Sequence, residues 1–216
     1  MHLVTASLPP QPDQPSSIRP SVERIRDSAL KRFAAHGVSA TSLRDIADTA
    51  GVSVGLVQHH FGTKDRLVDA VDNHVLAILG ASLAGAPATP TQDPVADHGH
   101  RVTSLIAEHI DVIDYIVRAM LEDTATGKLI FDTLATMGED RWNRLGEGQL
   151  AAPDLDGTWA ALNPLVLVLG AMALRTHLNR HLPEPLTTPT QLSRWESSVN
   201  TLIQGQLRKP PPSGDR

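Results

Sequence analysis

Two short helical segments on either side of a single glycine are the feature that most restricts how this chain can fold. Residues 42–50 begin with Ser42 and Asp45, an S-x-x-D pattern in which the hydroxyl and the carboxylate bind the first free amides of a helix. Gly51 follows this segment, as expected of a left-handed residue at a helix end. Ser53 then begins a second helix that ends near His60. The spacing predicts two short helices joined by a tight turn.

Helical spacing also runs through most of the 216 residues, and no segment alternates as a half-buried strand would. Apolar residues of 21–36 recur at intervals of three and four, and Gly37 follows them. Thr63 caps a further helix, whose buried stripe runs from Leu67 to Ile78. The predicted fold class is therefore all-α. The other predicted helices span residues 97–108, 111–123, 126–149, 157–181 and 189–207.

Composition excludes several kinds of protein. The chain has no cysteine, which excludes a disulfide scaffold and a thiolate metal site. Its best apolar run, residues 162–174, is shorter than the ~18 residues that a membrane span needs. We therefore expect a cytoplasmic protein that has no membrane partner. No cofactor is predicted, because neither a glycine-rich phosphate loop nor a Ser/His/Asp arrangement stands out.

The net charge of −5 is unevenly distributed. Residues 19–83 hold 8 Lys+Arg and 7 Asp+Glu, a net of +1, whereas residues 84–216 hold 11 and 16, a net of −5; Asp13 supplies the remaining −1. DNA-binding domains are often basic, so this balance counts mildly against one. Any basic surface in the N-terminal part has to be a local patch.

The paired helices around Gly51 match a helix-turn-helix, whose second helix enters the DNA major groove and reads base edges. In such proteins, phosphates are bound by helix N-termini and by hydroxyl, imidazole and ammonium groups. Ser42 and Ser53 stand at two helix starts of this segment, and Lys64 stands at its far end beside two histidines. A helix-turn-helix pattern alone is weak evidence of function.

Residues 22–79 as a whole resemble the TetR family of transcriptional regulators. The matching stretch is ALKRFAAHGVSATSLRDIADTAGVSVGLVQHHFGTKDRLVDAV. Its family features are Phe33 with Gly37, the T-S-L-R-D-I-A start, the A-G-V-S-x-G turn and the closing H-H-F-x-x-K. Beyond this region only the helical layout and the length agree. The resemblance implies an N-terminal three-helix DNA-binding domain and a C-terminal helical bundle that binds a small molecule and pairs two subunits.

The resemblance also sets the expected domain boundaries. We expect a disordered arm at residues 1–18, the DNA-binding domain at 19–66, the ligand-binding and dimerisation domain at 67–208, and a disordered tail at 209–216. Residues 85–99, rich in Pro, Ala and Thr, are expected to form a linker or loop. The expected partners are a double-stranded DNA operator, a small-molecule effector, and a second copy of the chain paired through the last two long helices.

DNA contacts can be assigned residue by residue from the resemblance. The family most often has Tyr where Gln58 stands, and often has a polar residue where Val54 and Leu56 stand. The positions that often touch phosphates are Thr41, Ser42, Ser53, His59, His60 and Lys64. The positions near base edges are Arg44, Val54, Gly55, Leu56 and Gln58.

These departures from the family predict a base preference. Glutamine can bond to adenine N6 and N7, and small apolar groups can contact the thymine methyl group. We therefore expect A·T pairs under the reading helix, while Arg44 could bind guanine. This requires Val54 and Leu56 to be exposed. They could instead be core residues, although Val52 and Val57 already supply a core face.

Three pairs of histidines raise the alternative of a metal site: His59 with His60, His98 with His100, and His177 with His181. Adjacent helical residues point about 100° apart, so the first pair is poorly placed to share one ion. The second pair flanks a glycine in the expected loop, where solvated histidines are the simpler interpretation. The third has the spacing of zinc ligands but lacks the glutamate of the protease motif. We predict no metal site.

Candidate ligand-binding residues lie in the C-terminal part. Large flexible or aromatic side chains often line cavities, although they fill cores as often. Two arginines lie in apolar predicted helices, where a charge needs a partner. That partner could be an effector carboxylate or an internal Asp or Glu. The candidates are Arg118, Met137, Trp142, Met172 and Arg175.

The expected function is that of a ligand-responsive transcriptional repressor that binds a palindromic operator as a dimer and is released by an inducer. Two alternatives stay open. The chain could be a DNA-binding dimer without an effector, or an all-helical enzyme that docks through its N-terminal unit. Activation of transcription is also open, and the effector and the operator are not identified by the sequence.

Overall fold

The computed structural model describes residues 19–83, 93–148, 151–152 and 154–207, and within them it is built from helices. In these ranges, Ala151 and Leu207 form an isolated antiparallel β-bridge. The predicted all-α class is confirmed. No helix in the described part of the chain is long and apolar enough to cross a bilayer. The expected arm and tail, and most of the expected linker, lie outside the described residues.

Three helices form the N-terminal unit: α1 (Ser21–His36), α2 (Leu43–Ala50) and α3 (Val54–Phe61). Their bounds agree with the prediction within a residue or two. Ile25, Phe33, Ile46 and Val57 are fully buried where the three helices meet. Because a three-helix unit of this size has only one small core, these side chains fix how the helices are rotated about their axes.

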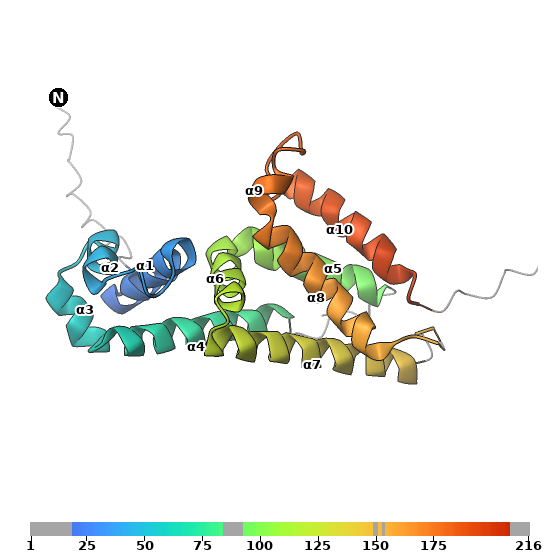
Figure 1. The fold of residues 1–216 in the computed structure, drawn as a ribbon, viewed down its shortest axis with the longest axis horizontal. Coiled ribbons are helices and arrows are strands. Elements are labelled where there is room, and N and C mark those ends of the chain that lie inside the picture. The colour runs from blue at the N-terminus through green and yellow to red at the C-terminus, as the bar shows by residue number, and fades with distance from the viewer. Residues whose placement is uncertain (1–18, 84–92, 149–150, 153, 208–216) are drawn as a thin grey trace, which may run out of the picture.

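The helix α4 (Lys64–Leu83) joins the N-terminal unit to the rest of the molecule (Figure 1). Its first turns pack against the helix-turn-helix unit, and its far end reaches the C-terminal helices. Four residues, one turn or so apart, form its buried stripe: Leu67, Val71, Val75 and Leu79. The single helix therefore contributes to the cores of both parts of the chain.

The C-terminal part contains six helices in the described residues: α5 (Pro94–Glu108), α6 (Ile110–Leu121), α7 (Ala125–Glu147), α8 (Gly157–Ala173), α9 (Arg175–Leu178) and α10 (Pro189–Gln204). Two predictions need correction. The expected helix 157–181 is interrupted at Leu174, which lies between α8 and α9. The helix expected from residue 97 begins at Pro94, because the Asp93 carboxylate accepts the backbone amides of Val95 and Ala96 at 3.0 Å.

Hydrogen bonds join helix α6 to α1 and α4, and α4 in turn to α7. The Arg118 Nε–H donates to the carbonyl oxygen of Ala34 (2.8 Å), and its Nη2 donates to that of Ala35 (3.0 Å), both at the C-terminus of α1. Asp72 of α4 accepts the hydroxyls of Tyr115 on α6 (2.5 Å) and Thr126 on α7 (2.6 Å). Burial and the Asp72 hydrogen bond both raise the pKa of Tyr115, so its hydroxyl stays a donor.

Helices α5 and α10 approach each other closely at Gly99. A Cβ atom at this position would overlap the side-chain amide of Asn200, which is itself buried. Nearby, the Thr103 hydroxyl of α5 donates to the Glu196 carboxylate of α10 at 2.7 Å. A larger residue at position 99 would displace the Asn200 amide from its place between the two helices.

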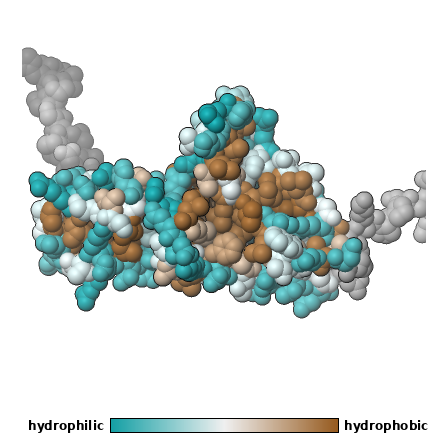
Figure 2. Space-filling model, viewed as in Figure 1, coloured by the Kyte–Doolittle hydropathy of each residue, from teal (hydrophilic) through white to brown (hydrophobic). Residues whose placement is uncertain are grey.

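Apolar side chains are exposed on α8, on α10 and at the turn between α8 and α9. Figure 2 shows brown, hydrophobic atoms gathered over α8 and the adjoining part of α10. Single exposed apolar residues are common, but a group of large ones on neighbouring elements indicates a surface made for contact. We call this group the α8–α10 patch; its members are Trp159, Val166, Leu167, Leu174 and Leu202.

Candidate nucleic-acid interface

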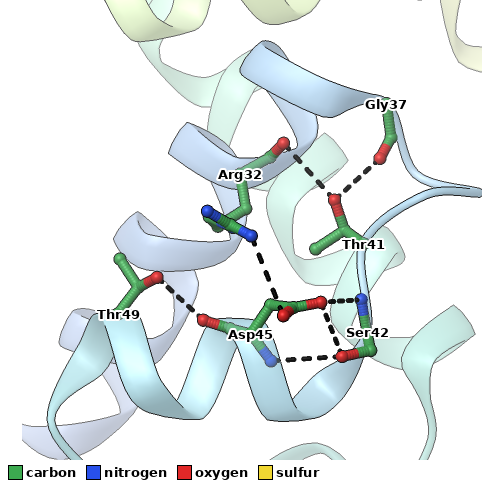
Figure 3. Close-up of polar contacts among 6 residues, drawn as sticks. All are labelled: Arg32, Gly37, Thr41, Ser42, Asp45 and Thr49. Carbon is green, nitrogen blue, oxygen red and sulfur yellow. Dashed lines mark hydrogen bonds and ion pairs between the residues drawn. The ribbon is translucent and has the colours of Figure 1, made fainter.

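The capping box at the start of α2 is present as predicted (Figure 3). The Ser42 Oγ accepts the Asp45 amide at 3.2 Å, and the Asp45 carboxylate accepts the Ser42 amide at 2.9 Å and its hydroxyl at 2.6 Å. These hydrogen bonds from Ser42, with a smaller contribution from Arg32, hold the pKa of Asp45 below its ordinary value of 3.8. The box fixes where α2 begins.

The turn between α2 and α3 depends on Gly51. Its φ of 66° and ψ of 42° lie in the left-handed region, which a side chain disfavours. In this conformation the Val52 amide reaches back to the Ala47 carbonyl at 3.0 Å. The chain reverses direction within the turn and delivers Ser53 as the cap of α3, where its Oγ accepts the Leu56 amide at 3.2 Å.

The rotation of α3 determines which side chains face outward. Val57 is fully buried, so Gly55 and Gln58 are exposed on the other side of the helix, as the prediction of base contacts requires. Val54 and Leu56 are half-buried. Val54 packs against the core, so its expected exposure holds only in part, because the short helix has few other residues with which to cover the core edge.

Thr41 does not occupy the place that the prediction gave it. Its side chain is only 2% exposed, and its hydroxyl donates to the carbonyl oxygens of Gly37 (2.8 Å) and Arg32 (3.4 Å) (Figure 3). Its amide donates to Val38. The Thr41 side chain therefore holds the α1–α2 loop, and we withdraw it from the predicted phosphate contacts.

His59 and His60 lie in the last turn of α3, and Lys64 lies in the first turn of α4. His59 and His60 are exposed. The His60 Nε2 lies 2.8 Å from the Ser21 hydroxyl at the start of α1. Sequence reasoning missed Ser21, because no pattern links residues 39 positions apart. Ser42, Arg44 and Ser53 are likewise exposed, whereas Lys64 is half-buried.

A second candidate site is a cavity of about 770 Å³ in the C-terminal part, lined by residues of α4, α5, α6, α7, α8 and α10. Of the predicted ligand-binding residues, Met137 and Trp142 line it. Met172 is buried elsewhere in the core. Arg118 and Arg175 do not line the cavity: the first binds α1 carbonyls, and the second makes two hydrogen bonds to Asp114, at 2.8 and 3.0 Å. Internal partners therefore hold both arginines.

Sequence reasoning also missed the polar wall of the cavity. His98, expected to be solvated in a loop, lies in α5 and lines the cavity, and burial lowers its pKa to about 4. Arg101 and Arg141 line the same wall. The Asp93-Pro94 dipeptide, an N-cap followed by proline at the first helical position, is the signal that could have placed His98 in a helix.

The N-terminal unit matches a known family. Residues 25–71 match the family model described as bacterial regulatory proteins, tetR family. The matched region starts within α1, contains all of α2 and α3, and ends at Val71 of α4. The N-terminal unit is therefore a DNA-binding unit of the TetR type. The capped helix-turn-helix described above is the part of the molecule that carries this match.

A curated relative is similar over the same region and beyond. The HTH-type transcriptional regulatory protein RaaS of Mycobacterium tuberculosis is 32% identical over 117 residues, which are 54% of this chain and 53% of RaaS. The chain thus matches about half the length of this relative. The relative is named as a regulatory protein of transcription.

Solved structures of TetR-type regulators share the whole fold. The ketosteroid transcriptional regulator KstR2 of Mycobacterium tuberculosis has a TM-score of 0.65 at 18% identity, covering 89% of this chain and 97% of KstR2. AibR, solved in complex with isovaleryl coenzyme A and operator DNA, has a TM-score of 0.64 at 14% identity, covering 85% and 97%. The α4 connection and the C-terminal helices therefore belong to the same architecture.

We expect Ser42→Ala to destabilise the protein in a pH-dependent way. Because Ser42 lowers the pKa of Asp45 in the folded state, the stabilisation is complete above the ordinary pKa of 3.8 and is lost as the pH falls through the lower folded pKa. Urea unfolding should give a clear loss of stability at neutral pH and a smaller loss below 3.8. The control is Ser39→Ala, an exposed serine in the preceding loop. An equal loss at both pH values would contradict this account.

Proposed function

We propose that this protein is a transcriptional repressor that binds operator DNA as a homodimer and is released from it by a small molecule. The observation that carries the proposal is the agreement between the family match and the geometry of residues 42–64. The capped α2, the Gly51 turn and the outward face of α3 together present hydroxyl, imidazole, amide and ammonium groups on one unit. Those are the groups that bind phosphates and base edges.

Each half of the dimer would place α3 in a major groove. The N-termini of α2 and α3, at Ser42 and Ser53, suit phosphate oxygens, since free amides and the helix dipole favour an anion there. Gly55 lets the helix backbone come close to the DNA. Gln58 is exposed and free to bond adenine, so we keep the expectation of A·T pairs under α3. Selection of binding sites from random DNA checks this: a consensus of G·C pairs alone at that place excludes it.

We expect His59→Ala combined with Lys64→Ala to weaken operator binding by about tenfold. The dependence of affinity on salt should also fall, because the variant makes fewer phosphate contacts and so releases fewer counterions from the DNA. The measurement is fluorescence anisotropy with the promoter DNA of the chain's own gene, at several salt concentrations. The matched control is Lys128→Ala with His181→Ala, which removes an exposed lysine and an exposed histidine from the C-terminal part. Unchanged affinity and salt dependence in the first variant would refute the assignment.

The α8–α10 patch supports pairing of two copies of the chain. Trp159 and Val166 of α8 are 58% and 56% exposed, and Leu202 of α10 is 63% exposed. Burying the two aliphatic side chains against an identical surface removes apolar area from water without leaving a hydrogen bond unmade. Pairing there would set the separation of the two α3 helices, which has to fit successive major grooves, about 34–36 Å apart or a multiple of that spacing.

We expect Val166→Glu to separate the dimer, because the interface would have to bury a charge without a partner. Gel filtration with light scattering should give a dimer for the unmodified protein and a monomer for the variant. Operator binding should fall with the loss of the dimer. The control is Leu121→Glu, at a more exposed leucine outside the patch. A dimer that survives Val166→Glu would show that another surface pairs the subunits.

Ligand control has a physical route in this fold. Leu79 and Leu83, at the end of α4, line the cavity, and Lys64, at its start, stands at the expected DNA surface. Helix α6 gives a second route, since Ile113 lines the cavity and Arg118 binds the end of α1. A ligand that fits the cavity better in one arrangement of these helices would shift the population toward that arrangement. AibR, which is solved with both an acyl coenzyme A and DNA, supports this use of the fold.

We expect Arg118→Met to weaken operator binding by about fivefold to tenfold, although Arg118 lies away from the expected DNA surface. The variant loses the hydrogen bonds that hold α1 against α6, which together contribute about 1 kcal/mol or more. The N-terminal unit then occupies more orientations relative to α6, and fewer of them fit the DNA. Operator affinity and thermal stability should be measured together. The control is Arg180→Met, at an exposed arginine near α9. Operator affinity equal to that of the control would remove α6 from the mechanism.

A further inference from the structure

The cavity of the C-terminal part is apolar over most of its surface. Its volume of about 770 Å³ lies within the range of sites that enclose a small molecule. Helices α4, α6 and α8 supply aliphatic side chains, and α7 and α10 each add a tryptophan. The residues that define this apolar wall are Leu79, Ile113, Leu165, Val168, Trp142 and Trp195.

Basic side chains of α5 and α7 form another part of the cavity lining, which we call the basic wall. His98 and Arg101 of α5, and Arg141 and Arg144 of α7, line the cavity there. Arg141 is half-buried, and burial lowers its pKa to about 10, so it stays protonated at neutral pH. A guanidinium has five N–H donors, so it can bind a protein acceptor and a ligand at the same time.

The three acidic residues that line the cavity are engaged with neighbours of their own or face solvent. Asp97 accepts the Arg101 Nε–H at 3.0 Å. Glu196 accepts the Thr103 hydroxyl at 2.7 Å. Asp140 is exposed. Burial lowers the pKa of Arg141 most, whereas Asp97, and more weakly Asp93, also attract Arg141 and raise its pKa.

Charged neighbours of both signs act on the His98 imidazole, and their effects on its pKa can be compared. Burial lowers its pKa most, Arg141 and Arg101 lower it further, and Asp97 opposes them with a smaller effect. At neutral pH the imidazole is uncharged, and it offers one N–H donor and one acceptor nitrogen. The two arginines thus outweigh the carboxylate at this point of the wall, which favours an anion over a cation.

We propose that this cavity binds a small molecule that has an apolar body and one anionic head group of the carboxylate type. The body lies against α4, α6 and α8, and the head group lies between His98 and Arg141. A charged head group is held there by charge-assisted hydrogen bonds in surroundings that largely exclude water. The proposal names the ligand class of the effector site, and in that sense it rests on the proposed function.

Three probes that share one apolar body test the proposal directly. Pyrenebutyrate is anionic, pyrenebutanol is neutral and pyrenebutylamine is cationic, and the fluorescence of each changes on entering an apolar site. With the full-length protein we expect pyrenebutyrate to bind about tenfold more tightly than pyrenebutanol, and pyrenebutylamine to bind most weakly. Equal affinities, tighter binding of the amine, or no binding of any probe would each overturn the proposal.

Arg141→Met isolates the contribution of the basic wall. We expect the variant to bind pyrenebutyrate about tenfold more weakly while its affinity for pyrenebutanol stays unchanged, which also shows that the cavity remains folded. Arg180→Met, at an exposed arginine outside the cavity, is the control and should bind both probes normally. If Arg141→Met retains the preference for the acid, the head group is not held where we place it.

Operator binding by the same protein separates this proposal from the proposed function. Binding of pyrenebutyrate with the expected preference, in a protein that does not bind its promoter DNA, would support the ligand class and refute the repressor. Binding of promoter DNA with no preference for the acid would leave the repressor standing and refute the ligand class. Release of the DNA by pyrenebutyrate, but not by pyrenebutylamine, would support both.

Discussion

Burial of Val57 is the constraint on which the candidate DNA surface depends. The helix α3 is only eight residues long, and its fully buried Val57 packs with Ile25, Phe33 and Ile46 from the two other helices of the unit. A rotation of α3 by one residue, about 100°, would take this side chain into water and bury Gln58 in its place. The hydrophobic effect therefore sets the orientation of the polar face, although none of the core residues approaches DNA.

The connection between the two parts of the chain also depends on buried apolar side chains. Helix α4 has no interruption between Lys64 and Leu83, and its buried residues belong to one continuous apolar core that spans both parts of the chain. Arg118 adds a polar link from α6 to the end of α1, where helix carbonyls lack partners of their own. The N-terminal unit is thus held at two places, so its position depends on how α4 and α6 are packed around the cavity.

Local signals predicted the N-terminal unit well because its structure is locally determined. The capping box at Ser42, the glycine at 51 and the cap at Ser53 each act within four residues, and all three appear in the structure as expected. Thr41 was misjudged because its hydroxyl binds carbonyls that only the folded loop brings near. The cavity could not be predicted in the same way. Arg141 and His98 both line it but are separated by more than forty positions in the sequence. Likewise, Arg175 binds Asp114 on another helix, and no periodicity in the sequence indicates this pair.

The absence of a side chain at Gly99 has a consequence for the whole C-terminal part. Because the buried Asn200 side chain of α10 occupies the space that a Cβ would need, α5 and α10 pack closely at that point. Helix α5 forms one wall of the cavity, and α10 carries part of the exposed apolar surface. The glycine therefore lies where the helix that lines the hollow meets the helix that carries part of the outer apolar face.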